Sequence, residues 1–154
     1  MNIRRAQNNQ KDCNLVYNLS NDPEVRANSF NTALIEYSNH VAWYNRILTD
    51  ENVLFFLLFE DNNFIGQIRF RRETKESDSC IISLSITEQF RGKGMGSLFL
   101  QKGMGEMNKT WPDIKKIIAE IKKENKSSIS LFERNGFRKI EENENFIYES
   151  EIIK

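Results

Sequence analysis

Histidine, cysteine and proline are scarce in this sequence, and their scarcity excludes several kinds of site. The chain has one histidine, His40, two cysteines, Cys13 and Cys80, and two prolines. No cluster of Cys and His has the spacing of a zinc site, so we expect no bound metal. Each cysteine falls in a segment with the pattern of an apolar helix or strand. Both are therefore predicted to be buried thiols in a reducing compartment, the cytoplasm.

The sequence also lacks an excess of charge of either sign. Lys and Arg together number 22, as do Asp and Glu, which gives a formal net charge of zero. A neutral chain has no overall field that would attract nucleic acid or an anionic membrane surface. We therefore expect neither as a partner.

Long apolar runs are missing as well. The longest spans residues 53–59, far short of the roughly 20 residues that a membrane-spanning helix needs. The N-terminal residues have no apolar segment of the signal-peptide kind. The length of 154 residues suits one domain, residues 1–154, with a core large enough to fold without disulfides.

The hydrophobic pattern predicts an α+β domain with a mixed central β-sheet flanked by helices. Residues 53–71 have the pattern of a hairpin, and residues 24–32 are polar and irregular. A parallel crossover is required only from residues 80–86 to 114–121, because a helix connects these two strands. Predicted strands span residues 2–7, 53–59, 64–71, 80–86, 114–121, 137–141 and 146–153; predicted helices span 9–20, 38–48, 95–107 and 125–134.

A glycine-spaced basic segment, residues 89–96, follows the strand at 80–86 and opens the next helix; it reads QFRGKGMG. Backbone N–H groups that converge at a helix N-terminus bind phosphate oxygens, and glycines let the backbone approach closely. A dinucleotide fingerprint is excluded because its third glycine comes one residue early here. An ATPase loop is excluded because Gly94, not Ser or Thr, follows Lys93. Taken alone, the motif also fits a simple connecting turn.

Two motifs together resemble the GNAT acetyltransferase superfamily. Arg91-x-x-Gly94-x-Gly96 is similar to the coenzyme A loop of that family. Residues 125–137, NKSSISLFERNGF, resemble its Asn-x-x-(small)-x-x-Leu-Tyr-x-x-x-Gly-Phe segment. The resemblance covers about residues 80–140. It implies a GNAT-like acyl-CoA N-acyltransferase fold, an N-acetyltransferase activity, and acetyl-CoA as the cofactor.

The resemblance also implies which residues hold acetyl-CoA. Backbone amides from Arg91 to Gly96 would bind the pyrophosphate, and a strand amide near Ile86 would polarise the thioester carbonyl. The family often has a proton-donating Tyr where this chain has Phe132, so the general acid would be Ser128, a water or no group. The implied cofactor-binding set is Ser85, Ile86, Thr87, Arg91, Gly92, Lys93, Gly94, Met95, Gly96, Ser97, Asn125, Ser128 and Phe132.

The residues before position 80 carry a second resemblance. RANSFN at 26–31, HVAWY at 40–44 and IGQIRF at 65–70 resemble one branch of the superfamily. That branch N-acetylates nucleotide-linked amino sugars on the way to pseudaminic and related nonulosonic acids. It implies a UDP-amino sugar as the small-molecule acceptor and is compatible with a homodimer. The implied substrate-binding set is Arg26, Ser29, Asn31, His40, Trp43, Tyr44 and Arg69.

Several of these residues have a purely structural interpretation. His40, Trp43 and Tyr44 can be core residues on one helix face, and Arg69 can be a solvated strand residue. Ser29 and Asn31 can cap a turn.

A sugar amine is less basic than the lysine side chain, so a modest general base suffices to deprotonate it. His40 and Glu88 are the candidates for that base. Ser128 is the third candidate catalytic residue.

Three alternatives remain at the level of function. A protein N-terminal acetyltransferase would have an open groove for peptide. A non-catalytic CoA-binding domain is suggested by Phe132 in place of Tyr. A polyamine acceptor would require an acidic pocket, and residues 24–50 contain no acidic cluster.

Overall fold

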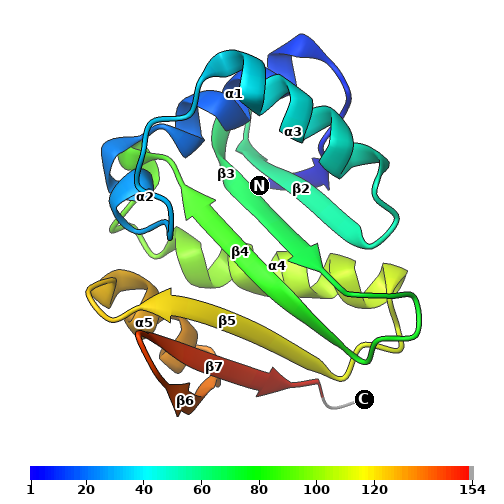
Figure 1. The fold of residues 1–154 in the computed structure, drawn as a ribbon, viewed down its shortest axis with the longest axis vertical. Helices are drawn as coiled ribbons and strands as arrows, with labels where there is room; N and C mark the ends of the chain where they lie inside the picture. Colours follow the sequence, from blue (N-terminus) through cyan, green and yellow to red (C-terminus); the bar gives the residue numbers. More distant parts are fainter. Residues whose placement is uncertain (153–154) are drawn as a thin grey trace.

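The structure is a computed structural model, and it describes residues 1–152. One mixed sheet forms its centre, with helices on both faces (Figure 1). The predicted α+β architecture is confirmed. The strands are β1 (Asn2–Arg5), β2 (Val53–Glu60), β3 (Asn63–Arg71), β4 (Ser79–Ile86), β5 (Lys116–Lys122), β6 (Arg138–Glu142) and β7 (Asn145–Glu151). The helices are α1 (Gln10–Ser20), α2 (Pro23–Ala27), α3 (Tyr37–Thr49), α4 (Met95–Thr110) and α5 (Lys126–Arg134), with a 3₁₀ turn at Glu88–Phe90.

The sheet has the strand order β1-β2-β3-β4-β5-β7-β6. Within residues 1–152, β4 and β5 form the parallel pair and every other neighbouring pair is antiparallel. The parallel crossover predicted between residues 80–86 and 114–121 is therefore confirmed, with α4 as its connection. The last predicted strand extended to residue 153, which lies outside the described residues.

The two central strands separate soon after they pair. Their register runs only from Ser79↔Lys116 to Ile81↔Ile118. Beyond that point β4 continues to Ile86, still paired with β3 on its other side. The β5-facing edge of β4 is thus left without a strand partner, and a wedge opens between the two strands.

Each face of the sheet has its own hydrophobic cluster. On one face, α4 and α5 pack through residues such as Phe99, Met107 and Leu131. On the other face, α1 and α3 pack on β2 through residues such as Val16 and Tyr44.

Helix α2 was not predicted, since residues 24–32 lack a hydrophobic period. Its start nevertheless has a local cause: Asp22 accepts hydrogen bonds from the backbone N–H of Glu24 (3.0 Å) and Val25 (3.2 Å), and Pro23 occupies the first turn. None of the residues of α2 is buried, which is why the hydrophobic pattern missed it. Across residues 1–152, none of the helices has the length and apolarity needed to cross a membrane.

Candidate active site

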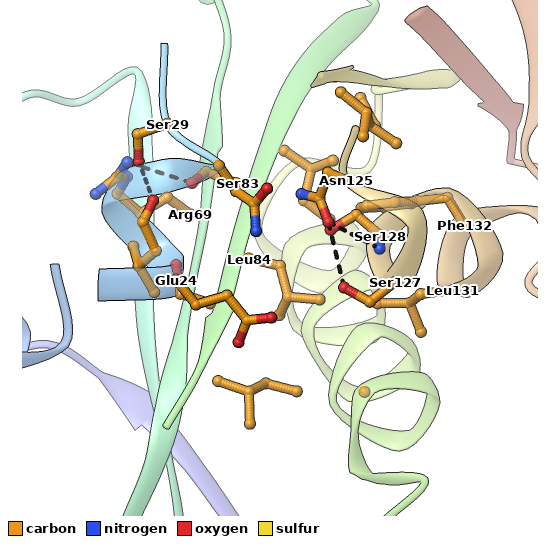
Figure 2. Close-up of a pocket in the computed structure, with 18 of the residues that line it drawn as sticks. Glu24, Ser29, Arg69, Ser83, Leu84, Asn125, Ser127, Ser128, Leu131 and Phe132 are labelled. Carbon is orange, nitrogen blue, oxygen red and sulfur yellow. Dashed lines mark hydrogen bonds between the residues drawn. The ribbon is translucent and has the colours of Figure 1, made fainter. Parts of the chain in front are cut away.

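A cleft with a volume of about 950 Å³ occupies the wedge between β4 and β5. It is lined by α2 and the loop after it, by β3, β4 and β5, by the glycine loop, and by α5. Figure 2 shows Glu24, Ser29, Arg69 and Ser83 on one side of this cleft and the α5 residues on the other. Residues from the predicted acetyl-CoA-binding set and from the predicted substrate-binding set therefore line the same cleft.

The free edge of β4 presents backbone donors to the cleft. The N–H of Thr87 donates to the carbonyl of Ile65 on β3 (2.8 Å). Because successive N–H groups of a strand point in opposite directions, those of Leu84 and Ile86 point away from β3, into the wedge. These amides can pair with an extended amide chain or polarise a carbonyl. The sequence-based expectation of a donor near Ile86 agrees with this direction.

The glycine loop leads into α4 with the geometry of an anion site. Gly92 and Gly94 have φ of 73° and 75°, in the left-handed region that favours glycine. Gly94 caps α4 without a side-chain hydrogen bond, so the first amides of the helix have no side-chain acceptor. A Cβ built on Gly92 or Gly94 would meet no atom within 4 Å, so it is the backbone angle that requires glycine. The open space beside the loop suits a pyrophosphate at the positive end of the helix dipole.

The basic side chains of the loop have other roles. Arg91 forms ion pairs with Asp22 (2.9 Å) and Glu24 (2.8 Å) of the α2 segment. Lys93 is exposed, lies 5.9 Å from the ring of Phe90, and is not part of the cleft lining. Anion binding at this loop therefore rests on backbone amides and the helix dipole more than on side-chain charge.

Asn125 and α5 form the opposite wall. Asn125 caps the helix, because its Oδ1 accepts hydrogen bonds from the backbone of Ser128 and the hydroxyl of Ser127, both at 3.2 Å. Ser128 is half-buried at the cleft. The ring of Phe132 also lines the cleft and packs edge-on against Phe137, with centroids 4.9 Å apart. Ser128 lies one helical turn before Phe132 on α5, and its hydroxyl is a candidate proton donor in place of a tyrosine.

Besides Lys93, two residues of the implied cofactor set, Thr87 and Ser97, do not line the cleft. Thr87 is bonded to β3 and does not line the cleft. The hydroxyl of Ser97 accepts a hydrogen bond from Asn135 (3.0 Å), which joins α4 to the end of α5. Both support the wall of the cleft from outside.

Two arginine side chains from β3, Arg69 and Arg71, line the cleft. Arg69 and Arg71 are on β3, and Arg69 packs over the rings of Trp43 (4.9 Å) and Phe55 (5.4 Å) and donates to the hydroxyl of Ser83 (3.3 Å). Burial, with a smaller effect of Arg71, lowers the pKa of Arg69 to about 10, so it stays cationic at neutral pH. No carboxylate within residues 1–152 lies within 4 Å of either guanidinium.

His40 and Tyr44 do not line the cleft. His40 is 2% exposed, its Nε2 lies 2.9 Å from the carbonyl oxygen of Cys13, and its ring stacks on Tyr44. The hydroxyl of Tyr44 donates to the carbonyl of Gln7 (2.7 Å). His40 and Tyr44 are therefore core residues, as the structural interpretation predicted. Neither reaches the cleft, which corrects the expectation that His40 is a base or ligand and that Tyr44 is a ligand. Trp43, on the same helix, does line the cleft.

Arg26, Ser29 and Asn31 line the cleft, but their polar groups build its wall. Arg26 donates to the carbonyls of Ser20 (2.6 Å) and Asn31 (2.9 Å) and to the hydroxyl of Ser29 (3.1 Å). That hydroxyl donates in turn to the carbonyl of Val25 (2.6 Å). This network fixes the shape of the loop after α2, so the contribution of Arg26 is the form of the cleft more than a free charge.

A family model described as an acetyltransferase (GNAT) domain matches residues 1–138 of the chain. The chain belongs to the GNAT acetyltransferase family. It is an N-acetyltransferase that uses acetyl-CoA, as the resemblance of the glycine loop and of residues 125–137 implied.

Individual relatives agree with this membership. Acetyltransferase PseH of Campylobacter jejuni is 27% identical over 146 residues, which cover 93% of this chain and 87% of PseH. An N-alpha-acetyltransferase of Saccharolobus solfataricus is 26% identical over 103 residues, or 60% of this chain and 61% of that protein. The crystal structure of C. jejuni PseH in complex with acetyl coenzyme A has a TM-score of 0.75 at 18% identity. The superposition covers 97% of this chain and 99% of PseH and confirms the fold.

Acetyl-CoA fits the residues of this GNAT enzyme at two points. The amides of α4 and the left-handed glycines form a cradle for the pyrophosphate. The unpaired edge of β4, at Leu84 and Ile86, suits the amide-bearing pantetheine arm. When bound, acetyl-CoA supplies the thioester that is the acetyl donor.

The sequence-based interpretation missed the carboxylates of this cleft. Glu88 is exposed in the turn before the glycine loop and does not line the cleft, whereas Glu24 and Glu120 do. Within the described lining there is no His, Cys, Lys or Tyr, so these two carboxylates are its proton acceptors. Ile117, Ala119 and Ile121 of β5 point into the core, which places Glu120 on the opposite face. That alternation is visible in the sequence, but the wedge beside it is not.

Proposed function

We propose that this GNAT enzyme acetylates the amine of a nucleotide-linked amino sugar. The observation that carries the proposal is the pair Arg69 and Arg71, which face the cleft from the acceptor side without a carboxylate partner among the described residues. Arg71 is exposed, but Arg69 is half-buried, and a half-buried cation that lacks a counter-ion is unfavourable until an anion reaches it. An acceptor that bears a negative charge is therefore preferred.

A nucleoside diphosphate supplies the groups that this cleft lacks. Guanidinium groups bind phosphate oxygens in a bidentate manner. Trp43 and the 58% exposed Phe30 line the same space and offer apolar faces to a sugar or base ring. The similarity to acetyltransferase PseH of C. jejuni extends along 93% of the chain and so includes the strands and helices of the acceptor half.

Other amines fit the cleft less well. A polyamine is a multiple cation and would be repelled by Arg69 and Arg71. A peptide N-terminus offers no fixed anion next to its amine. The similarity to the N-alpha-acetyltransferase covers only 60% of the chain and does not account for the two unpaired arginines.

The geometry also supports assignments for the chemical step. Extending the register Ile81↔Ile118 by two residues sets the backbone of Glu120 across the wedge from Ser83. The Oε1 of Glu120 accepts a hydrogen bond from Asn145 on β7 (3.3 Å). Glu24 is neutralised by its ion pair with Arg91, whereas Glu120 has no ion pair among the described residues, so Glu120 is the carboxylate that we assign as general base for the amine. With acetyl-CoA bound, the backbone amide of Ile86 would donate to the carbonyl oxygen of the thioester. Ser128 would be the proton donor to the CoA thiolate, a leaving group that needs little assistance.

A panel of acceptors tests the proposal. The protein is mixed with acetyl-CoA and with a UDP-linked amino sugar, the same amino sugar without its nucleotide, spermidine, or a peptide with a free N-terminus. Release of the CoA thiol is measured over time. We expect the UDP-linked sugar to give the highest kcat/KM of the four. Faster turnover of spermidine or of the peptide would contradict the proposal.

A further inference from the structure

Helix α2 stands at the open end of the wedge and is tethered at both of its ends to the cofactor-binding half. At its N-terminal end, Arg91 of the glycine loop holds Asp22 and Glu24. At its C-terminal end, the ammonium group of Lys122, the last residue of β5, donates to the carbonyl of Ala27 (3.0 Å). The helix therefore connects the ends of the two strands that separate below it, and Figure 1 shows it beside the end of β4.

Arg91 has its donors engaged in this tether. One terminal nitrogen lies 2.9 Å from Asp22, the other lies 2.8 Å from Glu24, and Nε donates to the carbonyl of Ile86 (2.9 Å). The planar guanidinium suits such a divergent set of acceptors. Although burial opposes it, the hydrogen bond from Arg91 keeps the pKa of Asp22 below its ordinary range. Arg91, the first residue of the GNAT loop motif, thus points its side chain toward α2.

The helix cannot hold this place by its own packing. It has five residues, none of them buried, and a helix of that length is unstable in isolation. Yet Glu24, Val25, Arg26 and Asn28, in or next to α2, line the acceptor half of the cleft. The position of that wall depends on contacts at the two ends of the helix.

We propose that Arg91 is a positioning residue for the acceptor: together with Lys122 it holds α2 across the mouth of the wedge and so sets acceptor affinity. The proposal rests on the proposed function only for the choice of acceptor in the assay. CoA affinity, which relies on backbone amides of the same loop, depends little on this side chain.

Substitutions at Arg91, Glu24 and Lys122 distinguish an effect on acceptor binding from an effect on CoA binding. Arg91→Gln should raise KM for the UDP-linked amino sugar about tenfold and change Kd for CoA by less than about twofold. Glu24→Gln and Lys122→Gln, which each remove one contact and leave the glycine loop intact, should raise the same KM about threefold. Arg91→Lys, which can reach only one of the carboxylates, should fall between the wild type and Arg91→Gln. A purely local disturbance of the loop would leave KM unchanged in the Glu24 and Lys122 variants.

Hydrogen exchange gives a readout that needs no turnover. With CoA at saturation, the backbone amides of residues 22–28 should exchange faster in Arg91→Gln than in the wild type, and Lys93→Gln should leave their exchange unchanged. If the wild type acetylated no nucleotide-linked sugar, the proposed function would fail while exchange still decided this inference. Unchanged exchange in Arg91→Gln, or a raised Kd for CoA with an unchanged acceptor KM, would overturn it.

Discussion

Glu120 is the residue that we propose as proton acceptor, in place of His40 and Glu88, the candidates from the sequence. It lines the cleft on the acceptor face of β5, whereas His40 is buried and Glu88 lies outside. Glu120→Gln keeps the shape of the side chain and removes its charge. We expect kcat to fall about 100-fold, the usual effect of losing a general base, with Kd for CoA unchanged. Steady-state kinetics and calorimetric titration with CoA measure the two quantities.

Glu88→Gln is the matched control, since it removes a carboxylate from the neighbouring surface. We expect it to retain the kcat of the wild type. A large loss in this variant, with Glu120→Gln fully active, would reverse the assignment.

Burial gives His40 a pH-dependent effect on stability. Burial is the main cause of its lowered pKa, so the folded protein takes up a proton less readily than the unfolded chain. The contribution to stability is therefore complete above the unfolded pKa of about 6.5 and is lost as the pH falls through the lowered value. We expect the free energy of unfolding in urea to decrease from about pH 7.5 to about pH 5, and His40→Phe to reduce that decrease.

The test compares how steeply the free energy of unfolding changes with pH in the wild type and in His40→Phe. His40→Phe also removes the bond to the carbonyl of Cys13, which lowers stability at every pH. Asp12 is also buried, and its carboxylate lies 2.7 Å from a guanidinium nitrogen of Arg4. Although burial opposes it, the hydrogen bond from Arg4 lowers the pKa of Asp12. Its contribution is lost only below about pH 4, outside the chosen window. The same slope in both proteins would show that His40 does not titrate as described.

At the residue scale, the sequence predicted the cofactor half of the site more completely than the acceptor half. The glycine loop is contiguous, and its left-handed glycines and the following helix start are local features. His40 and Trp43 are three positions apart on α3, so helical periodicity places both on one face. Which of them reaches the cleft depends on the packing of α1: His40 turns to Cys13, and Trp43 stacks with Arg69.

Among the elements, α4 shows how one glycine can be required where its neighbour is not. Gly103 is buried, and a Cβ there would lie 2.5 Å from the side chain of Ile68 on β3. Gly105 is exposed, with no atom within 4 Å of an added Cβ. The predicted helix over 95–107 is confirmed, and of the two glycines that weaken its propensity, Gly103 is the one that brings α4 close to the sheet.

Two alanine variants test this distinction. Gly105→Ala should stabilise the protein by about 1 kcal/mol, because alanine favours the helix. Gly103→Ala gains the same propensity but overpacks the contact with Ile68, so it should be less stable than Gly105→Ala by about 1–3 kcal/mol. Urea unfolding measures both. Equal stability of the two variants would mean that α4 does not depend on a close approach at Gly103.

Helix α2 is the element that the hydrophobic pattern could not predict. Its start signal, Asn21-Asp22-Pro23, is present in the sequence, but no residue of the helix is buried. Besides the local cap at Asp22, its position depends on Arg91, distant in sequence, and on Lys122 of β5. Long-range polar contacts of this kind leave no periodic trace in the chain.

At the scale of the whole molecule, the candidate active site forms where β4 and β5 stop pairing. The order of strands and the parallel crossover follow from the elements and their connections. The separation of β4 from β5 after Ile81↔Ile118 does not, because no residue type marks the point where two strands stop pairing. That separation brings together the glycine loop, Asn125, Arg69 and Glu120, which come from four different parts of the chain.

We propose that this GNAT enzyme selects an anionic, nucleotide-linked acceptor through Arg69 and Arg71. The most direct test compares kcat/KM for a UDP-linked amino sugar with that for the same sugar without its nucleotide, in the wild type and in Arg71→Gln. Arg71 is exposed, so its loss should not disturb folding. We predict that Arg71→Gln lowers kcat/KM about tenfold for the UDP-linked sugar, the effect of losing one charged contact to phosphate, and leaves the other value unchanged. Equal values for the two sugars in the wild type, or no effect of the substitution, would contradict the account.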